Sequence, residues 1–223
     1  GFGYDKTFEA LVPAITVNER QMGYPANVMV YLFVVNRDTF ERYGLEPPPE
    51  RWTWEEFEEM GVAFVEKANA GLRYRRHYFL NRPRMQVFRR LFGTTTYNET
   101  LTAPILDDPK YIEVLKTIHR WTWDLHIVPT EAEENAFTTE GGWGGASFQL
   151  FNSGNYAMVG TGRHAIIHFR KYGVLNIETI EPPHVAFPNT IIVPRNVTVY
   201  AGSDKQDLAY YYMKYLASKA YND

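Results

Sequence analysis

The chain contains no cysteine, and it contains no long apolar run. The first absence excludes disulfides and thiolate metal sites, but it does not fix the redox compartment, because an exported protein can also lack cysteine. The second absence excludes a membrane-spanning helix, which needs about 20 apolar residues in succession. The chain starts at Gly1 without a basic-then-apolar signal segment, so we expect it to be processed or a fragment.

A strong excess of either charge is also lacking. The 23 lysines and arginines nearly balance the 26 acidic residues, which gives a formal net charge of -3. Such a balance produces no overall field toward nucleic acid or an anionic membrane. Residues 73–90 do contain seven arginines and no acid. We interpret them as a solvated face or a contact for an anionic small ligand or acidic partner, and we predict no nucleic-acid partner.

Apolar and aromatic residues, by contrast, are plentiful. Of the 223 residues, 45% are hydrophobic, enough for the core of one large domain or two small lobes. Aromatic residues reach 16%, including 16 tyrosines and 5 tryptophans. Because tyrosine and tryptophan combine a stacking face with a polar edge, they suit polyhydroxylated ligands as well as cores. The composition therefore predicts a soluble globular protein.

The hydrophobic pattern predicts alternating strands and helices, and so an α/β fold. Residues 24–35 form an apolar run typical of one strand buried on both faces. Asp38 is expected to cap a short helix, and Thr53 with Glu56 forms a capping box before a longer one. Asp108 and Pro109 begin another helix. An acidic linker and a short helix starting near Ser147 follow, then strands within 174–180, 189–194 and 196–200, and a last helix within 203–220.

The segment GTGRHA, residues 160–165, matches the pattern G-x-G-x-x-A of dinucleotide-binding loops. It arrives too late in the chain for the usual nucleotide domain, so we predict instead a tight turn from a strand into a short helix. His164 and His168 are four residues apart, but no third metal ligand is evident. No residue stands in the context of an activated nucleophile, and we predict no catalytic residue, metal or cofactor.

Four segments in order resemble the solute-binding proteins of carbohydrate ABC transporters, the maltose-binding-like group of the two-lobed periplasmic-binding-protein type II fold. They are YPANVMVYLFVVNRDTFERYGLEPPPERWTWEEF, LFGTTTYNETLTAPILDDPKYIEVLKTIHRWTWDLHIVP, FQLFNSGNYAMVGTGRH and SDKQDLAYYYMKYLAS. The resemblance implies that the chain is mostly the second lobe, at 26–183. Hinge segments and part of the first lobe are expected at 1–25 and 184–223. It also implies a location in the periplasm or outside the cytoplasm, and a chain that is not itself membrane-spanning.

The resemblance also implies ligand contacts on three loops and the hinge. In this sequence they fall on Tyr24, Asn27, Asn81, Arg82, Trp143, Thr161, Arg163 and His164. Met29 occupies a position where some relatives carry a sugar-binding acid, and His164 one where many place a stacking tryptophan. With Arg163 beside His164, this departure suggests a ligand with an acidic group, whereas local capping or packing is the competing interpretation.

The function implied is non-enzymatic: two lobes close around a sugar or sugar acid and deliver it to an ABC transporter permease. Two alternatives stay open. One is a small α/β nucleotide-dependent or carbohydrate-active enzyme that uses the GTGRHA turn. The other is a sensory or structural protein that keeps the binding fold without solute transport.

Overall fold

The computed structural model describes residues 7–136, 145–173, 176–185, 188–216 and 218–222. The chain divides into two units, one of Gly1–Val30 with Ile192–Asp223 and one of Tyr31–Ile191. We treat each by itself. The fold is mixed α/β, as predicted. The assignment of 26–183 to the second lobe and of the flanking segments to the first lobe stays a prediction.

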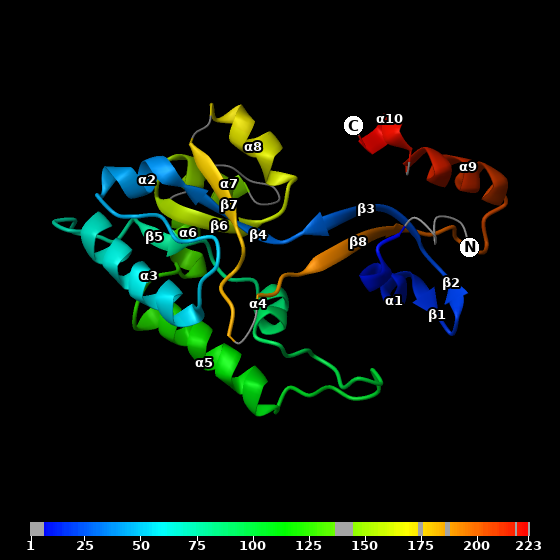
Figure 1. Cartoon of the computed structure of the whole chain (residues 1–223), viewed down its shortest axis with the longest axis horizontal. Coiled ribbons are helices and arrows are strands. Elements are labelled where there is room, and N and C mark those ends of the chain that lie inside the picture. The colour runs from blue at the N-terminus through cyan, green and yellow to red at the C-terminus, as the bar shows by residue number, and fades with distance from the viewer. Residues whose placement is uncertain (1–6, 137–144, 174–175, 186–187, 217, 223) are drawn as a thin grey trace. The chain divides into compact units, whose positions relative to one another are not determined.

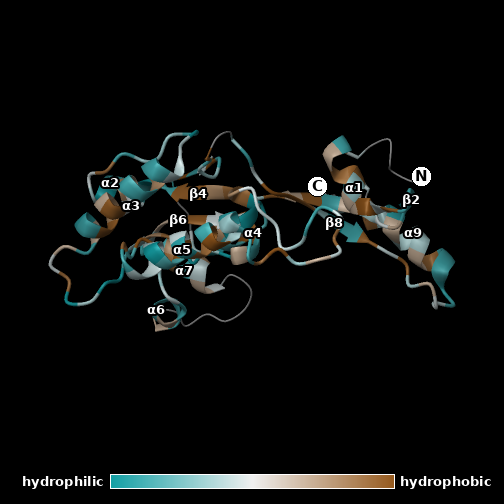
Figure 2. Ribbon diagram, turned by 90° about the horizontal axis from the view of Figure 1, so that it is seen from below, coloured by the Kyte–Doolittle hydropathy of each residue, from teal (hydrophilic) through white to brown (hydrophobic). Residues whose placement is uncertain are grey.

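A four-stranded sheet forms the centre of the Tyr31–Ile191 unit. Its strands lie in the order β5 (Tyr78–Leu80), β6 (Tyr156–Thr161), β4 (Leu32–Asn36) and β7 (Ile177–Ile180). β5 runs parallel to β6, whereas β4 is antiparallel to both β6 and β7. Figure 2 shows β4 and β6 in the colour of hydrophobic residues, as expected for strands whose two faces are covered.

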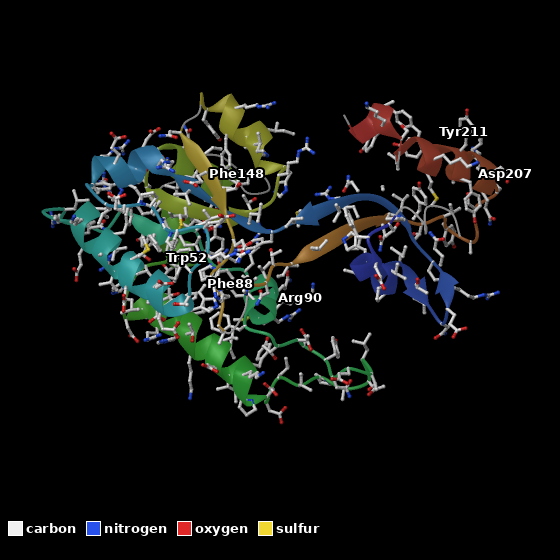
Figure 3. All side chains as sticks on the ribbon, viewed as in Figure 1. Trp52, Phe88, Arg90, Phe148, Asp207 and Tyr211 are labelled. Atoms are coloured by element: carbon white, nitrogen blue, oxygen red, sulfur yellow. The ribbon has the colours of Figure 1, made fainter. Side chains whose placement is uncertain are left out.

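Helices cover both faces of this sheet (Figure 1). On one face lie α3 (Trp54–Ala68) and α5 (Pro109–Trp123), and on the other α7 (Gly145–Asn152) and α8 (Ala165–Lys171). Alternate side chains of β4 point to the two faces of the sheet. Phe33 packs against Trp52, and Val34 belongs to the cluster around Phe148. Figure 3 labels Trp52 and Phe148, which lie on opposite sides of β4.

Local signals decide where these helices begin. Thr53 and Glu56 form the predicted capping box of α3, and Asp108 caps α5 as predicted. The prediction for α2 (Arg37–Arg42) is wrong by two residues, because the Asn36 side chain accepts a hydrogen bond from the Thr39 amide and is the N-cap. Asp38 lies in the first turn and accepts a hydrogen bond from the amide of Asn176.

The other unit is built on two paired strands, β3 (Tyr24–Val30) and β8 (Ile192–Val197), which run antiparallel. A 3₁₀ turn (Glu9–Leu11), α1 (Val12–Ile15), β1 (Thr16–Val17) and β2 (Arg20–Gln21) precede them. α9 (Gln206–Leu216) and α10 (Lys219–Asn222) follow. α9 has no buried residue, and its tyrosines, including Tyr211, are exposed (Figure 3).

The single strand predicted at 24–35 is in fact two strands in two sheets. β3 pairs with β8, whereas β4 pairs with β6 and β7, and Tyr31 lies between the two strands. The apolar run could not reveal this break, because each half has an apolar pattern of its own. The two strands predicted within 189–200 are, conversely, the one strand β8.

A half-buried histidine makes the stability of the Tyr31–Ile191 unit depend on pH. Burial lowers the pKa of His77, and the charges of Arg42 and Arg76 lower it further, against the opposing effect of the hydrogen bond to the Gly154 carbonyl. Below the unfolded pKa of about 6.5, the unfolded chain therefore binds more protons than the folded one. We expect the melting temperature to fall between pH 7.5 and 5.5. His77→Gln should reduce this fall, whereas the exposed control His119→Gln should leave it unchanged.

Candidate functional site: a polar cavity at the ends of β5 and β6

The candidate site lies at one edge of the four-stranded sheet. Because β5 and β6 are parallel, their carboxyl ends share this edge, and the pairing of Leu32 with Thr161 brings the start of β4 there too. Asn81 and Arg82 follow β5, and Arg163 follows β6. In open α/β sheets this is the edge at which ligands usually bind.

A cavity of about 540 Å³ opens beside the end of β5. Its wall is formed by the segment that leads into α4 (Met85–Leu91), by α6 (Glu131–Ala136) and by the start of α7. The residues that line it are Asn81, Arg82, Pro83, Arg84, Met85, Gln86, Glu134, Ala146 and Ser147. The structure thus places two predicted ligand contacts, Asn81 and Arg82, in one cavity.

Asn81 joins the ends of the two parallel strands. Its side-chain oxygen accepts a hydrogen bond of 2.8 Å from the amide of Gly160 in β6. The NH2 group of the Asn81 side chain donates to no other described residue, so its two N–H donors are available. Asn81 therefore has a structural role and a donor that a ligand in the cavity can use.

Gly160, the first residue of GTGRHA, is explained by packing and not by a turn. A Cβ placed there would lie 1.8 Å from the Tyr31 hydroxyl oxygen, so only glycine fits beside that ring. Gly160 belongs to β6 and, unlike Gly154, does not have a positive φ. The predicted tight turn is present between β6 and α8, where the Ala165 amide donates to the Gly162 carbonyl. It is not the reason for Gly160, which the close approach of Tyr31 explains.

Arg82 is held by two carboxylates of α6. Its guanidinium lies 2.9 Å from Glu131 and 3.5 Å from Glu134. The two acids are three residues apart and so share a helix face. Sequence analysis missed both, because it treated this segment as an acidic linker. The signal was present in Thr130 and Glu133, whose reciprocal hydrogen bonds form a capping box that starts α6.

Glu134 is the buried centre of the cavity wall. Only 8% of the residue is exposed. One carboxylate oxygen accepts hydrogen bonds from the hydroxyls of Ser147, at 2.8 Å, and Tyr156, at 3.1 Å. Burial raises the pKa of Tyr156, and the Glu134 carboxylate raises it further, so this hydroxyl keeps the proton that it donates.

The predicted contacts at the end of β6 and directly after it lie at the same edge but do not line the cavity. Thr161 is buried, and its hydroxyl lies 3.3 Å from Nε2 of His164. His164 also lies near Phe148, with 6.5 Å between the ring centroids. Arg163 is exposed and forms no ion pair with another described residue. Trp143 falls outside the described residues.

The two remaining predicted contacts, Tyr24 and Asn27, lie on β3 in the other unit. Asn27 is exposed, next to an irregularity in the pairing with β8. Tyr24 is partly buried, and burial raises the pKa of its hydroxyl. Tyr24 lines a cavity of about 590 Å³ within that unit, together with Tyr210 and Met213 of α9.

The comparison with protein families decides the class of this protein. Residues 3–223 match the model of the family described as bacterial extracellular solute-binding protein. The chain belongs to this family. A solute-binding protein holds its ligand without covalent chemistry, in agreement with the prediction of a protein that is not an enzyme. No curated protein sequence matches the chain.

Solved structures of other solute-binding proteins share the fold. An ABC substrate-binding protein from Listeria monocytogenes in complex with cycloalternan is 20% identical, with a TM-score of 0.76. A solute-binding protein from Thermotoga lettingae bound with α-D-tagatose is 17% identical, also with a TM-score of 0.76. The maltose-bound MalE3 of T. maritima is 16% identical, with a TM-score of 0.72.

The matches cover nearly all of this chain but only part of each of those relatives. The matches cover 97%, 99% and 97% of this chain, but 54%, 56% and 55% of the respective solved chains. The chain therefore spans about half their length. They confirm the type II periplasmic-binding-protein fold that the sequence predicts.

Two further observations bear on the site and its surroundings. Among the described residues, no three His, Cys, Asp or Glu side chains come together as a metal site would require. Among the same residues, no helix is both long enough and apolar enough to cross a membrane.

Proposed function

We propose that this protein binds a carbohydrate at the carboxyl edge of the sheet and delivers it to an ABC transporter permease. Membership of the solute-binding family supports the binding role. The ligands bound in similar structures, which include cycloalternan, tagatose, maltose and D-mannitol, support a polyhydroxylated solute. In this proposal the two lobes of the complete protein close around the solute, and the permease distinguishes the closed form.

The observation that carries the proposal is the polar wall of the cavity described above. Asn81 offers N–H donors, the Ser147 hydroxyl oxygen keeps acceptor capacity after donating to Glu134, and Gln86 offers both kinds of group. Each hydroxyl of a sugar donates and accepts, so a mixed set of this kind matches it. The apolar side chains of Pro83 and Met85 lie in the same wall, where a sugar face can pack.

Calorimetric titration tests this function. We expect the complete protein to bind at least one of maltose, mannotriose and D-mannitol, and not NAD. Gln86→Ala should weaken that binding by about threefold to tenfold, the effect of one lost hydrogen bond. Arg90→Ala is the control, because Arg90 lies on the same helix but outside the cavity wall. Binding of NAD alone would favour the enzyme alternative, and binding of no ligand would favour the sensory or structural one.

An acidic solute is the less supported form of this proposal. Of the cations that suggested it, Arg82 is already paired with two carboxylates, whereas Arg163 is exposed. If an acidic sugar is the ligand, Arg163→Ala should weaken its binding more than that of a neutral sugar. Equal weakening of both would remove this form of the proposal.

The location of the protein follows from the same proposal. The family is described as extracellular, which supports a place in the periplasm or outside the cytoplasm. Delivery to a permease requires that place, because the permease receives its solute from the outer side of the membrane. Both statements concern the complete protein and rest on family membership.

A further inference from the structure

We propose that Glu134 sets the charge selectivity of the cavity, because it neutralises Arg82 and excludes anionic solutes. This inference rests on the proposed function, since it concerns which carbohydrates the same cavity accepts. It assigns a specificity role to a residue that no sequence motif marks.

Glu134 occupies a shielded position in the cavity wall. Its side chain is 10% exposed and lines the cavity, whereas the side chain of Glu131, the other partner of Arg82, is 69% exposed and does not. A charge removed from water is poorly screened, so the carboxylate of Glu134 acts on a bound ligand far more strongly than that of Glu131.

The side chain of Glu134 is held in place as a hydrogen-bond acceptor. Ser147 from α7 and Tyr156 from β6 both donate to the same carboxylate oxygen. The other oxygen faces Arg82 at 3.5 Å. Together these contacts hold the carboxylate against α7, β6 and the segment that follows β5.

A ligand that enters the cavity meets an arginine whose charge is already paired. With both acids in place, the charge of Arg82 is already balanced, so a ligand carboxylate would compete with Glu134 and be repelled by it. Arg84 also lines the cavity, but it is exposed, where water and salt screen its charge. A neutral hydroxyl meets no such repulsion and can bond to the side chains of Asn81 and Gln86 and to the Ser147 hydroxyl oxygen.

Matched ligand pairs test this inference by calorimetry: maltitol with maltobionate, and D-mannitol with D-mannonate. For the unmodified chain we expect the neutral member of a pair to bind at least about tenfold more tightly. Glu134→Gln keeps the size of the side chain and removes its charge, so it should reduce this ratio by about tenfold. Ser147→Ala removes one contact of Glu134 without a change of charge, and should weaken both members by similar factors.

Glu131→Gln provides a second variant on an exposed side chain, in case Glu134→Gln does not fold. It should reduce the ratio in the same direction, but by less. Equal or tighter binding of the acidic members by the unmodified chain would overturn the inference while leaving carbohydrate binding intact. A ratio that neither variant changes would also overturn it. Binding of no member of either pair would overturn the proposed function, and this inference with it.

Discussion

Replacing Trp121 by alanine is expected to lower the free energy of unfolding of the Tyr31–Ile191 unit by about 3–5 kcal/mol. The residue is fully buried, and its ring centroid lies 4.8 Å from that of Phe57 and 5.3 Å from that of Trp54. Its indole nitrogen also donates to Glu58 at 2.6 Å. Truncation would leave a cavity among these rings and remove a hydrogen bond, so both losses act in the same direction.

The same helix supplies a matched control for this prediction. Trp123 lies two residues further along α5, but it is 57% exposed. Trp123→Ala should change the free energy of unfolding by only about 0.5 kcal/mol. Urea denaturation followed by circular dichroism measures both variants. Equal effects of the two substitutions would show that the aromatic cluster does not form as described.

Gly160→Ala is expected to destabilise the same unit by about 1–3 kcal/mol, the usual cost of forcing extra atoms into a packed site. The added Cβ would lie 1.8 Å from the Tyr31 hydroxyl oxygen, and the ring has little room to move, because Tyr31 is itself buried. The shift would also disturb the hydrogen bond from Gly160 to Asn81, so ligand binding should weaken along with stability.

A double substitution separates this clash from other causes. In a Tyr31→Ala background the ring is absent, so adding Gly160→Ala should cost less than it does in the unmodified chain. Urea denaturation of the four proteins gives the interaction energy directly. Equal costs in both backgrounds would show that the destabilisation does not come from Tyr31, and would return the glycine to a role in backbone conformation.

The sequence predicts local structure well where the signal is itself local. The capping box of Thr53 with Glu56 and the cap at Asp108 depend on residues three or fewer positions apart, and both helices start as predicted. The strand at 24–35 fails for the opposite reason. Whether an apolar run is one strand or two depends on partners such as β8 and β6, which are more than a hundred residues away.

The candidate site shows the same contrast. Asn81 and Arg82 were predicted from family resemblance, and the structure places both in one cavity wall. Glu134 was missed because a buried carboxylate and a solvated one look alike in a sequence. Its burial depends on α7 and β6, which supply Ser147 and Tyr156. The roles of these residues in ligand binding stay predictions until the titrations are made.

The sequence by itself indicated the class of this protein through the resemblance of four ordered segments to a known family. It also predicted the helix caps, because these depend on residues near one another in the chain. Only the tertiary structure decided why Gly160 must be small and which charges surround Arg82. Both depend on side chains that folding brings together from distant positions, Tyr31 in one case and Glu134 in the other.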